Sequence, residues 1–294
     1  MSLIAIATAA LAFAGTASAH TRVFGLRING NHQGDGQFKY IRSPEDNFPV
    51  TWPQVNNPEL ICNKIHGVAT PPAPEFLRAA AGDRVAFQWY HANPDPAQDM
   101  HTGVDVSHLG VLVTWIAPYT DGPGTGPIWT KIHEDGWANG EWATRRTLIA
   151  NGGFVEFTLP KSLKPGRYLV RQEVIALHMA DKREPGRGPE FYPSCAQLEV
   201  TGSGTAVPPQ KFDINQGYSK NETGLWWNAY IGKNDEYRMP GPAVWTGDGA
   251  GAGAGSNQES NDQPGSTTKP GGNQPTPTPT PSQSGVGNND SYGY

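Results

Sequence analysis

The chain has 294 residues, of which only 17% are charged, and its formal net charge is −5 at pH 7. It contains no run of basic residues, which argues against a nucleic acid as partner. Trp, Tyr and Phe make up 10% of the residues, and such a composition suits a surface that binds a neutral, hydrogen-bonding ligand such as a polysaccharide.

Residues 1–19 are predicted to be a signal peptide. They are small and apolar, and they end in Ala17-Ser18-Ala19, the pattern of a signal-peptidase site. Their apolar run is too short to cross a membrane, and no later segment is long enough. We therefore expect a secreted protein with no membrane partner, whose mature form begins at His20.

Alternating apolar residues predict short β-strands farther along the chain, over 84–90, 111–115, 155–159, 168–177 and 196–200. Gly- and Pro-rich turns separate these segments, and no long amphipathic helix is evident. The pattern predicts an all-β fold, a sandwich of two antiparallel sheets. Long loops over 29–60, 91–108 and 205–240 would decorate it, and loops of such length are usually functional.

The composition changes near Gly247, where Gly, Ser, Thr and Pro replace the large apolar residues. Such a segment cannot bury a core. We expect one globular domain over 20–245 and a disordered tail over 246–294. Cys62 and Cys195 are the two cysteines, and an even pair in an oxidising compartment predicts one disulfide.

Three residues are candidate metal ligands. His20 at a mature N-terminus offers its α-amine and its ring nitrogen, and His108 would add a third nitrogen just before a predicted strand. Nitrogen ligands suit copper, zinc and nickel, and a weak axial oxygen such as the phenol of Tyr192 favours copper. The alternative is that these histidines are ordinary surface or hydrogen-bonded residues, and a structural zinc site would want four closed ligands.

Several uncommon motifs follow one another in a familiar order: His20-Thr-Arg-Val-Phe24, Ser107-His-Leu-Gly110, Trp129–Gly136, Leu148-Ile-Ala150, Pro165–Arg171, Ile175-Ala-Leu-His178, Phe191–Gln197 and Tyr237-Arg-Met-Pro-Gly-Pro242. Over about 20–245 the chain resembles the fungal lytic polysaccharide monooxygenases of auxiliary-activity family nine, formerly classed as glycoside hydrolases. The resemblance implies an immunoglobulin- or fibronectin-like β-sandwich, and a disulfide between the two cysteines.

The resemblance also implies a reaction and a site. One copper ion would be held by His20 and His108, with Tyr192 as the axial group, and His178 and Glu190 would act with Tyr192 in catalysis. The enzyme would be a monomer that oxidises C1 or C4 of glycosidic bonds in cellulose or related β-glucans. It would use O2 or H2O2 and an external electron donor, which is a small reductant or a redox protein.

The chain departs from the family pattern at three places. Glu190 stands where the family usually has Gln, and an ionised Glu can only accept hydrogen bonds. Val111 replaces a usual Pro, and Asn221-Glu-Thr-Gly224 replaces a usual Asp-Pro-Gly segment that helps to shape the substrate face.

The late loop contains two further candidates. Tyr218 matches a surface tyrosine that stacks on sugar in relatives, so it is expected to bind substrate. His178, beside the expected copper site, is expected to contact substrate as well. Asn221 lies in an Asn-x-Thr sequon and is a candidate for glycosylation.

Other functional classes stay open at this point. A non-catalytic copper-binding or cell-wall protein on the same scaffold would keep the ligands and lose oxygen activation. A carbohydrate-binding module without catalysis is disfavoured by the intact site residues. A glycosidase needs two opposed carboxylates, and no spacing here singles out a pair.

Overall fold

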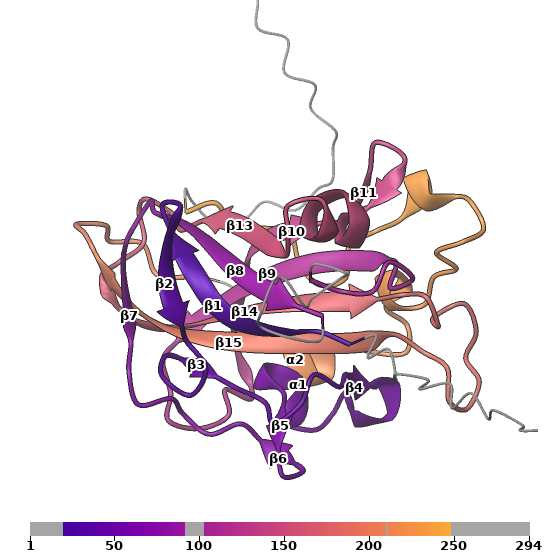
Figure 1. Cartoon of the computed structure of the whole chain (residues 1–294), viewed down its shortest axis with the longest axis horizontal. Helices are drawn as coiled ribbons and strands as arrows, with labels where there is room; N and C mark the ends of the chain where they lie inside the picture. The colour runs from indigo at the N-terminus through magenta and orange to yellow at the C-terminus, as the bar shows by residue number, and fades with distance from the viewer. Residues whose placement is uncertain (1–19, 92–102, 210, 248–294) are drawn as a thin grey trace, which may run out of the picture. The chain divides into compact units, whose positions relative to one another are not determined.

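The computed structural model describes residues 20–91, 103–209 and 211–247, all within one unit of the chain. The predicted signal peptide, most of the 91–108 loop and nearly all of the predicted tail lie outside the described residues. Two β-sheets face each other in this unit (Figure 1). The predicted all-β sandwich is thereby confirmed.

The smaller sheet has four antiparallel strands in the order β13-β8-β1-β2. Their bounds are β1 Arg22–Ile28, β2 Asn31–Asp35, β8 Arg84–Tyr90 and β13 Phe154–Thr158. The predicted strand 84–90 coincides with β8, and the predicted strand 155–159 overlaps β13.

The larger sheet has eight strands, with the main path β16-β10-β9-β14-β15-β3 and with β4 and β7 also paired to β15. Its pairs are antiparallel except for β7 with β15, which is parallel. The bounds are β3 Ile41–Arg42, β4 Val50–Thr51, β7 Leu77–Ala80, β9 Gly110–Pro118, β10 Pro127–Asp135, β14 Gly166–Ala176, β15 Glu190–Thr201 and β16 Phe212–Asp213.

Two small hairpins and short helical turns complete the described ranges. The hairpins pair β5 Lys64–Ile65 with β6 Val68–Ala69, and β11 Trp137–Ala138 with β12 Glu141–Trp142. The α-helical turns are α1 Glu59–Cys62 and α2 Ile214–Gly217, the 3-10 turns are Trp52–Gln54, Thr223–Leu225 and Asn234–Glu236, and a π-turn covers Thr144–Ile149. None of the helices in these ranges is long and apolar enough to cross a membrane.

The larger sheet is buried on both faces, which explains the nearly unbroken apolar sequence of β9. Leu112 and Ile116 point into the core between the sheets, where they join residues of β1 and β8. Val111, Val113 and Trp115 point the other way, into a second core with residues of α1 and α2. Residues 50–60 and much of the loop 205–240 therefore cover the second face, whereas β2 of the 29–60 segment is an exposed strand of the smaller sheet.

The disulfide joins Cys62 of α1 to Cys195 of β15, as predicted, and both cysteines are buried in this second core. The bond ties the loop that contains α1 to the central strand of the large sheet. It thus anchors the strand whose first residues, Glu190 and Tyr192, reach the candidate site.

Candidate metal centre

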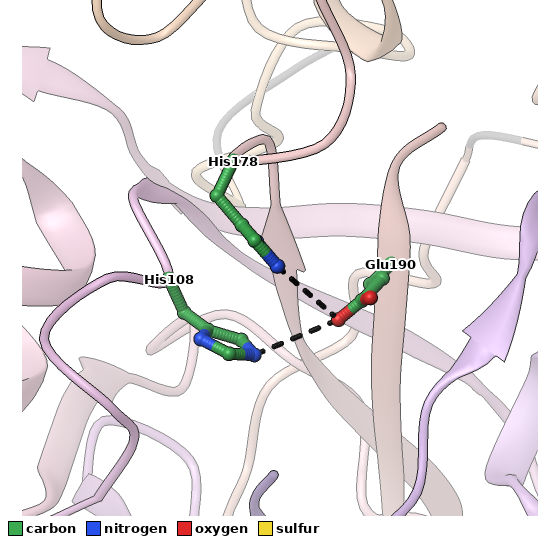
Figure 2. Close-up of side chains that lie close together, drawn as sticks. All are labelled: His108, His178 and Glu190. Carbon is green, nitrogen blue, oxygen red and sulfur yellow. Dashed lines mark ion pairs between the residues drawn. The ribbon is translucent and has the colours of Figure 1, made fainter. Parts of the chain in front are cut away.

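Three strand ends bring polar side chains to one end of the large sheet. His108 precedes β9, His178 follows β14, and Glu190 is the first residue of β15. The register pairs Ala176 of β14 with Gly110 on one side and with Glu190 on the other. Antiparallel pairing therefore fixes all three residues at the same end of the large sheet (Figure 2).

The three side chains meet at one carboxylate oxygen. The distance from Glu190 Oε2 is 3.6 Å to His108 Nε2 and 3.8 Å to His178 Nε2 (Figure 2). One donor atom from each residue lies within 4.8 Å of the other two, so the group could hold a metal ion. The imidazole rings of His108 and His178 also pack together, with centroids 4.1 Å apart.

Tyr192 lies beneath this group and is fully buried. Its hydroxyl donates a hydrogen bond of 2.7 Å to Glu190 Oε2, and it lies 3.1 Å from His108 Nε2. The other ring nitrogen of His108, Nδ1, lies 3.3 Å from Ser107 Oγ. His108 therefore turns Nε2 toward Tyr192 and Glu190, and its Nδ1 proton can be accepted by the serine hydroxyl.

His20 faces the same group from the smaller sheet. Its ring centroid lies 6.3 Å from that of His108, edge to face, and 6.1 Å from that of Tyr192. The carbonyl of His20 accepts a 3.0 Å hydrogen bond from Asn47 Nδ2, and the next residue, Thr21, is fully buried. The backbone at His20 is thus held in place immediately before β1.

Burial and neighbouring charges set the protonation states. Burial, assisted by His108, lowers the pKa of His178 to about 4, and burial also lowers the pKa of His20. Burial would raise the pKa of Glu190, but hydrogen bonds from His108 and Tyr192 and the nearby imidazoles hold it at about 2. Burial and the Glu190 charge raise the pKa of Tyr192 well above its usual value. At neutral pH His178 is neutral, Glu190 is ionised and Tyr192 keeps its proton.

This donor set fits a metal cation. Metal ligands must be deprotonated, and lowered histidine pKa values leave ring nitrogens free to coordinate. The group also carries a negative charge on Glu190, and its imidazole nitrogens suit copper, zinc or nickel. Within the described residues, the side chains of His20, His108, Tyr192 and Glu190 form one polar cluster, in which His20 and Glu190 are partly exposed and His108 and Tyr192 are buried.

The profile of the protein family described as Auxiliary Activity family 9 (formerly GH61) matches residues 20–237. The chain belongs to auxiliary activity family 9. The predicted family membership is confirmed, and with it the prediction of an enzyme, because the family consists of copper-dependent oxidoreductases. The coarser prediction of an oxidative, polysaccharide-cleaving monooxygenase is confirmed as well.

Named members of the family are similar over most of the chain. An AA9 family lytic polysaccharide monooxygenase A from Collariella virescens is 44% identical over 237 residues, which are 78% of this chain and 82% of that protein. One from Armillaria gallica is 40% identical over 236 residues, 78% of this chain and 88% of that protein. The solved structure titled CvAA9A superposes with a TM-score of 0.70 at 44% identity, covering 77% of this chain and 98% of that chain.

One predicted site residue does not lie where the sequence placed it. Tyr218 was expected on the surface, but it is 1% exposed, and its hydroxyl donates to Glu173 in the second core. The prediction that it stacks on sugar is wrong, because a buried ring cannot reach a polysaccharide. Its phenol instead caps a buried carboxylate that also binds Arg171.

Two exposed aromatic residues beside the site were missed. Phe48 is 51% exposed and packs on the His20 ring, with centroids 4.7 Å apart. Tyr230 is 59% exposed, and its hydroxyl contacts the carbonyl of Ser107, the neighbour of His108. For Tyr230, the signal in the sequence was the group of aromatic residues in the loop 205–240, but that loop offered several candidates. Asn221, the predicted glycosylation site, is exposed.

Proposed function

We propose that this protein is a secreted, monomeric copper monooxygenase that cleaves glycosidic bonds in cellulose or related β-glucans at C1, C4 or both. It would use O2 or H2O2 and an external electron donor. The observation that carries the proposal is the convergence of His108, His178 and Glu190 at one end of the large sheet, opposite the ring of His20, in a member of auxiliary activity family 9.

The amine and ring of His20 and Nε2 of His108 would hold copper, and the Tyr192 phenol would be a further, weak oxygen donor. The bound ion would supply one-electron chemistry and activation of the oxidant, which no side chain of this group offers alone. The amine becomes available only when residues 1–19 are removed, so secretion and metal binding belong together in this proposal.

The protein side chains have separate tasks. Ser107 Oγ accepts from Nδ1 of His108 and thereby orients Nε2 toward the ion. Tyr192 keeps its proton and donates a hydrogen bond to Glu190, so the phenol would remain a neutral and weak ligand. His178, half-buried with its Nε2 3.8 Å from Glu190 Oε2, would hold or give a proton at the oxidant.

Glu190 changes the hydrogen bonding of this pocket relative to the usual Gln. An amide can donate a hydrogen bond toward an oxidant, whereas ionised Glu190 can only accept. Glu190 Oε2 already accepts a hydrogen bond from the Tyr192 hydroxyl, and the same oxygen faces the imidazoles of His108 and His178. We therefore assign donation toward the oxidant to the single N–H of neutral His178, and we assign Glu190 to holding the Tyr192 phenol in place.

Phe48 and Tyr230 supply exposed aromatic faces near His20 and His108, respectively. Aromatic rings at a surface stack favourably on the C–H faces of sugar rings, and they lose little conformational entropy. These two residues are the sugar contacts of this proposal in place of Tyr218.

The test uses the secreted protein whose first residue is His20, loaded with copper and incubated with cellulose and a reductant. Mass spectrometry should detect oxidised cello-oligosaccharides, and a His20→Ala variant should release none. A second variant with a single glycine before His20 keeps the imidazole and blocks the amine, so it should bind copper more weakly by calorimetry. Stoichiometric copper binding without oxidised products from any β-glucan would leave a non-catalytic copper protein instead.

A further inference from the structure

A hollow lies where the connection from β14 to β15 meets the loops that contain Trp52 and Trp226. It has a volume of about 290 Å³ and is lined by Trp52, Trp226, Arg183, Arg187 and Lys220, together with Glu184 and neighbouring prolines and glycine. A neighbouring hollow of about 540 Å³ shares Trp52, Pro53 and Lys220 with it, and we call the first hollow the groove.

The groove is tied to the metal centre through the backbone. Trp52 follows Thr51 of β4, and Thr51 pairs with Glu190 in the register of β15. Gly188, two residues before Glu190, packs so closely that an added Cβ would lie 2.9 Å from the Cβ of Trp52. The loop that lines the groove therefore leads directly into β15, the strand that begins with Glu190.

The aromatic part of the groove is built by two tryptophans. The rings of Trp52 and Trp226 meet edge to face, with centroids 4.8 Å apart, and each ring is partly exposed. Such rings form the apolar floor on which sugar units commonly pack. The groove thus has one of the two elements of a carbohydrate subsite.

The second element is positive charge. Arg183 is exposed, and its guanidinium lies 5.2 Å from the centroid of the Trp226 ring. This contact orients the planar group and leaves its N–H donors free for a ligand. Lys220 is also exposed, and among the described residues neither Arg183 nor Lys220 forms an ion pair with a carboxylate.

The other charges near the groove are balanced. Arg187 binds Asp181 through two nitrogens, and this pair braces the loop. Glu184 lies 3.9 Å from Lys182, which is outside the lining of the groove. The uncompensated charges are therefore those of Arg183 and Lys220, on a protein whose formal net charge is −5.

We infer that this groove is a subsite for a sugar unit that carries a carboxylate. Tryptophan supplies the surface for the sugar ring, and the two free cations supply charge-assisted hydrogen bonds to the carboxylate. The carboxylate has two sources, a uronic acid branch on a hemicellulose or an aldonic acid at an oxidised chain end. The inference rests on the proposed function, because it takes the ligand to be the polysaccharide of the neighbouring oxidative site.

Calorimetry on the copper-loaded protein without reductant tests the subsite, since no turnover occurs. The first pair of probes is a xylo-oligosaccharide with one glucuronic acid branch and its carboxyl-reduced derivative. The second pair is cellotetraonic acid and cellotetraose. We expect the acid of at least one pair to bind more tightly than its neutral partner, and the pair that responds identifies the source of the carboxylate.

Variants then separate the subsite from general charge effects. Arg183→Gln and Lys220→Gln should each weaken binding of the acid about three- to tenfold, as expected for partly exposed charge pairs, and leave the neutral partner unchanged. Lys164→Gln is the control, because it removes the charge of an exposed lysine that lies outside the groove and, among the described residues, forms no ion pair. Equal affinities for acid and neutral probes, or equal effects of Arg183→Gln and Lys164→Gln, would overturn the inference.

The two proposals fail separately. Oxidised products from cellulose without any preference for acid probes would sink the subsite and leave the monooxygenase. Acid binding that depends on Arg183, without oxidised products from any glycan, would keep the subsite and sink the monooxygenase.

Discussion

Replacing Tyr218 with Phe tests whether this residue serves stability or sugar binding. The Tyr218 hydroxyl donates a 2.5 Å hydrogen bond to Glu173 Oε1, and both side chains are buried. Glu173 also accepts from Trp115 Nε1 at 2.9 Å and pairs with Arg171. Burial and the Glu173 charge raise the pKa of Tyr218 well above its usual value, so the phenol is a donor at every accessible pH.

The substitution removes one hydrogen bond to a buried charge and keeps the ring. Such bonds are worth roughly 1.5–3 kcal/mol, and the remaining partners of Glu173 favour the middle of this range, about 2 kcal/mol. For a folded domain of this size, that loss lowers the melting temperature by about 4–8 °C. Binding to cellulose should not change, since the hydroxyl does not reach the surface.

Tyr230→Ala is the matched variant, because Tyr230 is 59% exposed beside Ser107. It should leave the melting temperature within about 1–2 °C, as surface substitutions rarely change stability by more than 0.5 kcal/mol, and it should weaken cellulose binding. The measurements are calorimetric melting and a cellulose pull-down on the same samples. An unchanged melting temperature together with weakened cellulose binding for Tyr218→Phe would refute this reasoning.

Three further predictions use other parts of the molecule. Replacing both Cys62 and Cys195 with Ala should cost about 5 kcal/mol of unfolding free energy, because the bond closes a loop with a sequence separation of 133; a loss below 1 kcal/mol in denaturant titrations would contradict the chain-entropy account. In copper-free protein, the pKa of His178 is lower in the folded state than in the unfolded chain. As the pH falls, the unfolded chain therefore takes up a proton at His178 before the folded protein does. Unfolding free energy should therefore fall as pH drops from 6.5 to 4, by an amount on the order of 3 kcal/mol. His178→Gln should flatten this part of the curve measured in chelator, and parallel curves would show that other groups control it. Asn221 is exposed, so protein from a fungal host should lose the mass of one glycan in Asn221→Gln, as intact-mass spectrometry can check; equal masses would show an unused sequon.

The strands were predictable where apolar residues alternate, and β8 is the clearest example. The first half of β15 was not predicted, because Pro193 interrupts the pattern. Proline lacks the N–H that a central strand needs. Here β4 pairs with Glu190 and Phe191 and β3 pairs with Cys195 and Ala196, so Pro193 faces the gap between two short partners. Such a gap depends on segments more than a hundred residues away, and local sequence cannot reveal it.

The candidate site was predictable to a different degree at each residue. His108 and His178 flank strands with clear apolar patterns, and the pairing of β9 with β14 brings them to one end of the sheet. Tyr218 lies in a loop whose orientation depends on its own core. The Tyr218 hydroxyl donates a hydrogen bond to the carboxylate of Glu173, which is buried together with Arg171, and this bond keeps the ring in the core. A sequence pattern that places Tyr218 in a loop gives no information about that distant partner. In the structure Tyr218 is buried, and the exposed tyrosine of this loop is Tyr230.

His20 was found from the cleavage pattern, yet its position depends on contacts that the pattern does not contain. Asn47 Nδ2 binds the carbonyls of both His20 and His91, and Thr21 is fully buried, so the start of β1 is fixed independently of residues 1–19. Phe48, next to Asn47, packs on the ring itself. Removal of the preceding residues would therefore change the chemistry of one nitrogen, from peptide to amine, without requiring the imidazole to move. We expect processing to complete a site whose side chains are already arranged, and the glycine-extended variant isolates that single change.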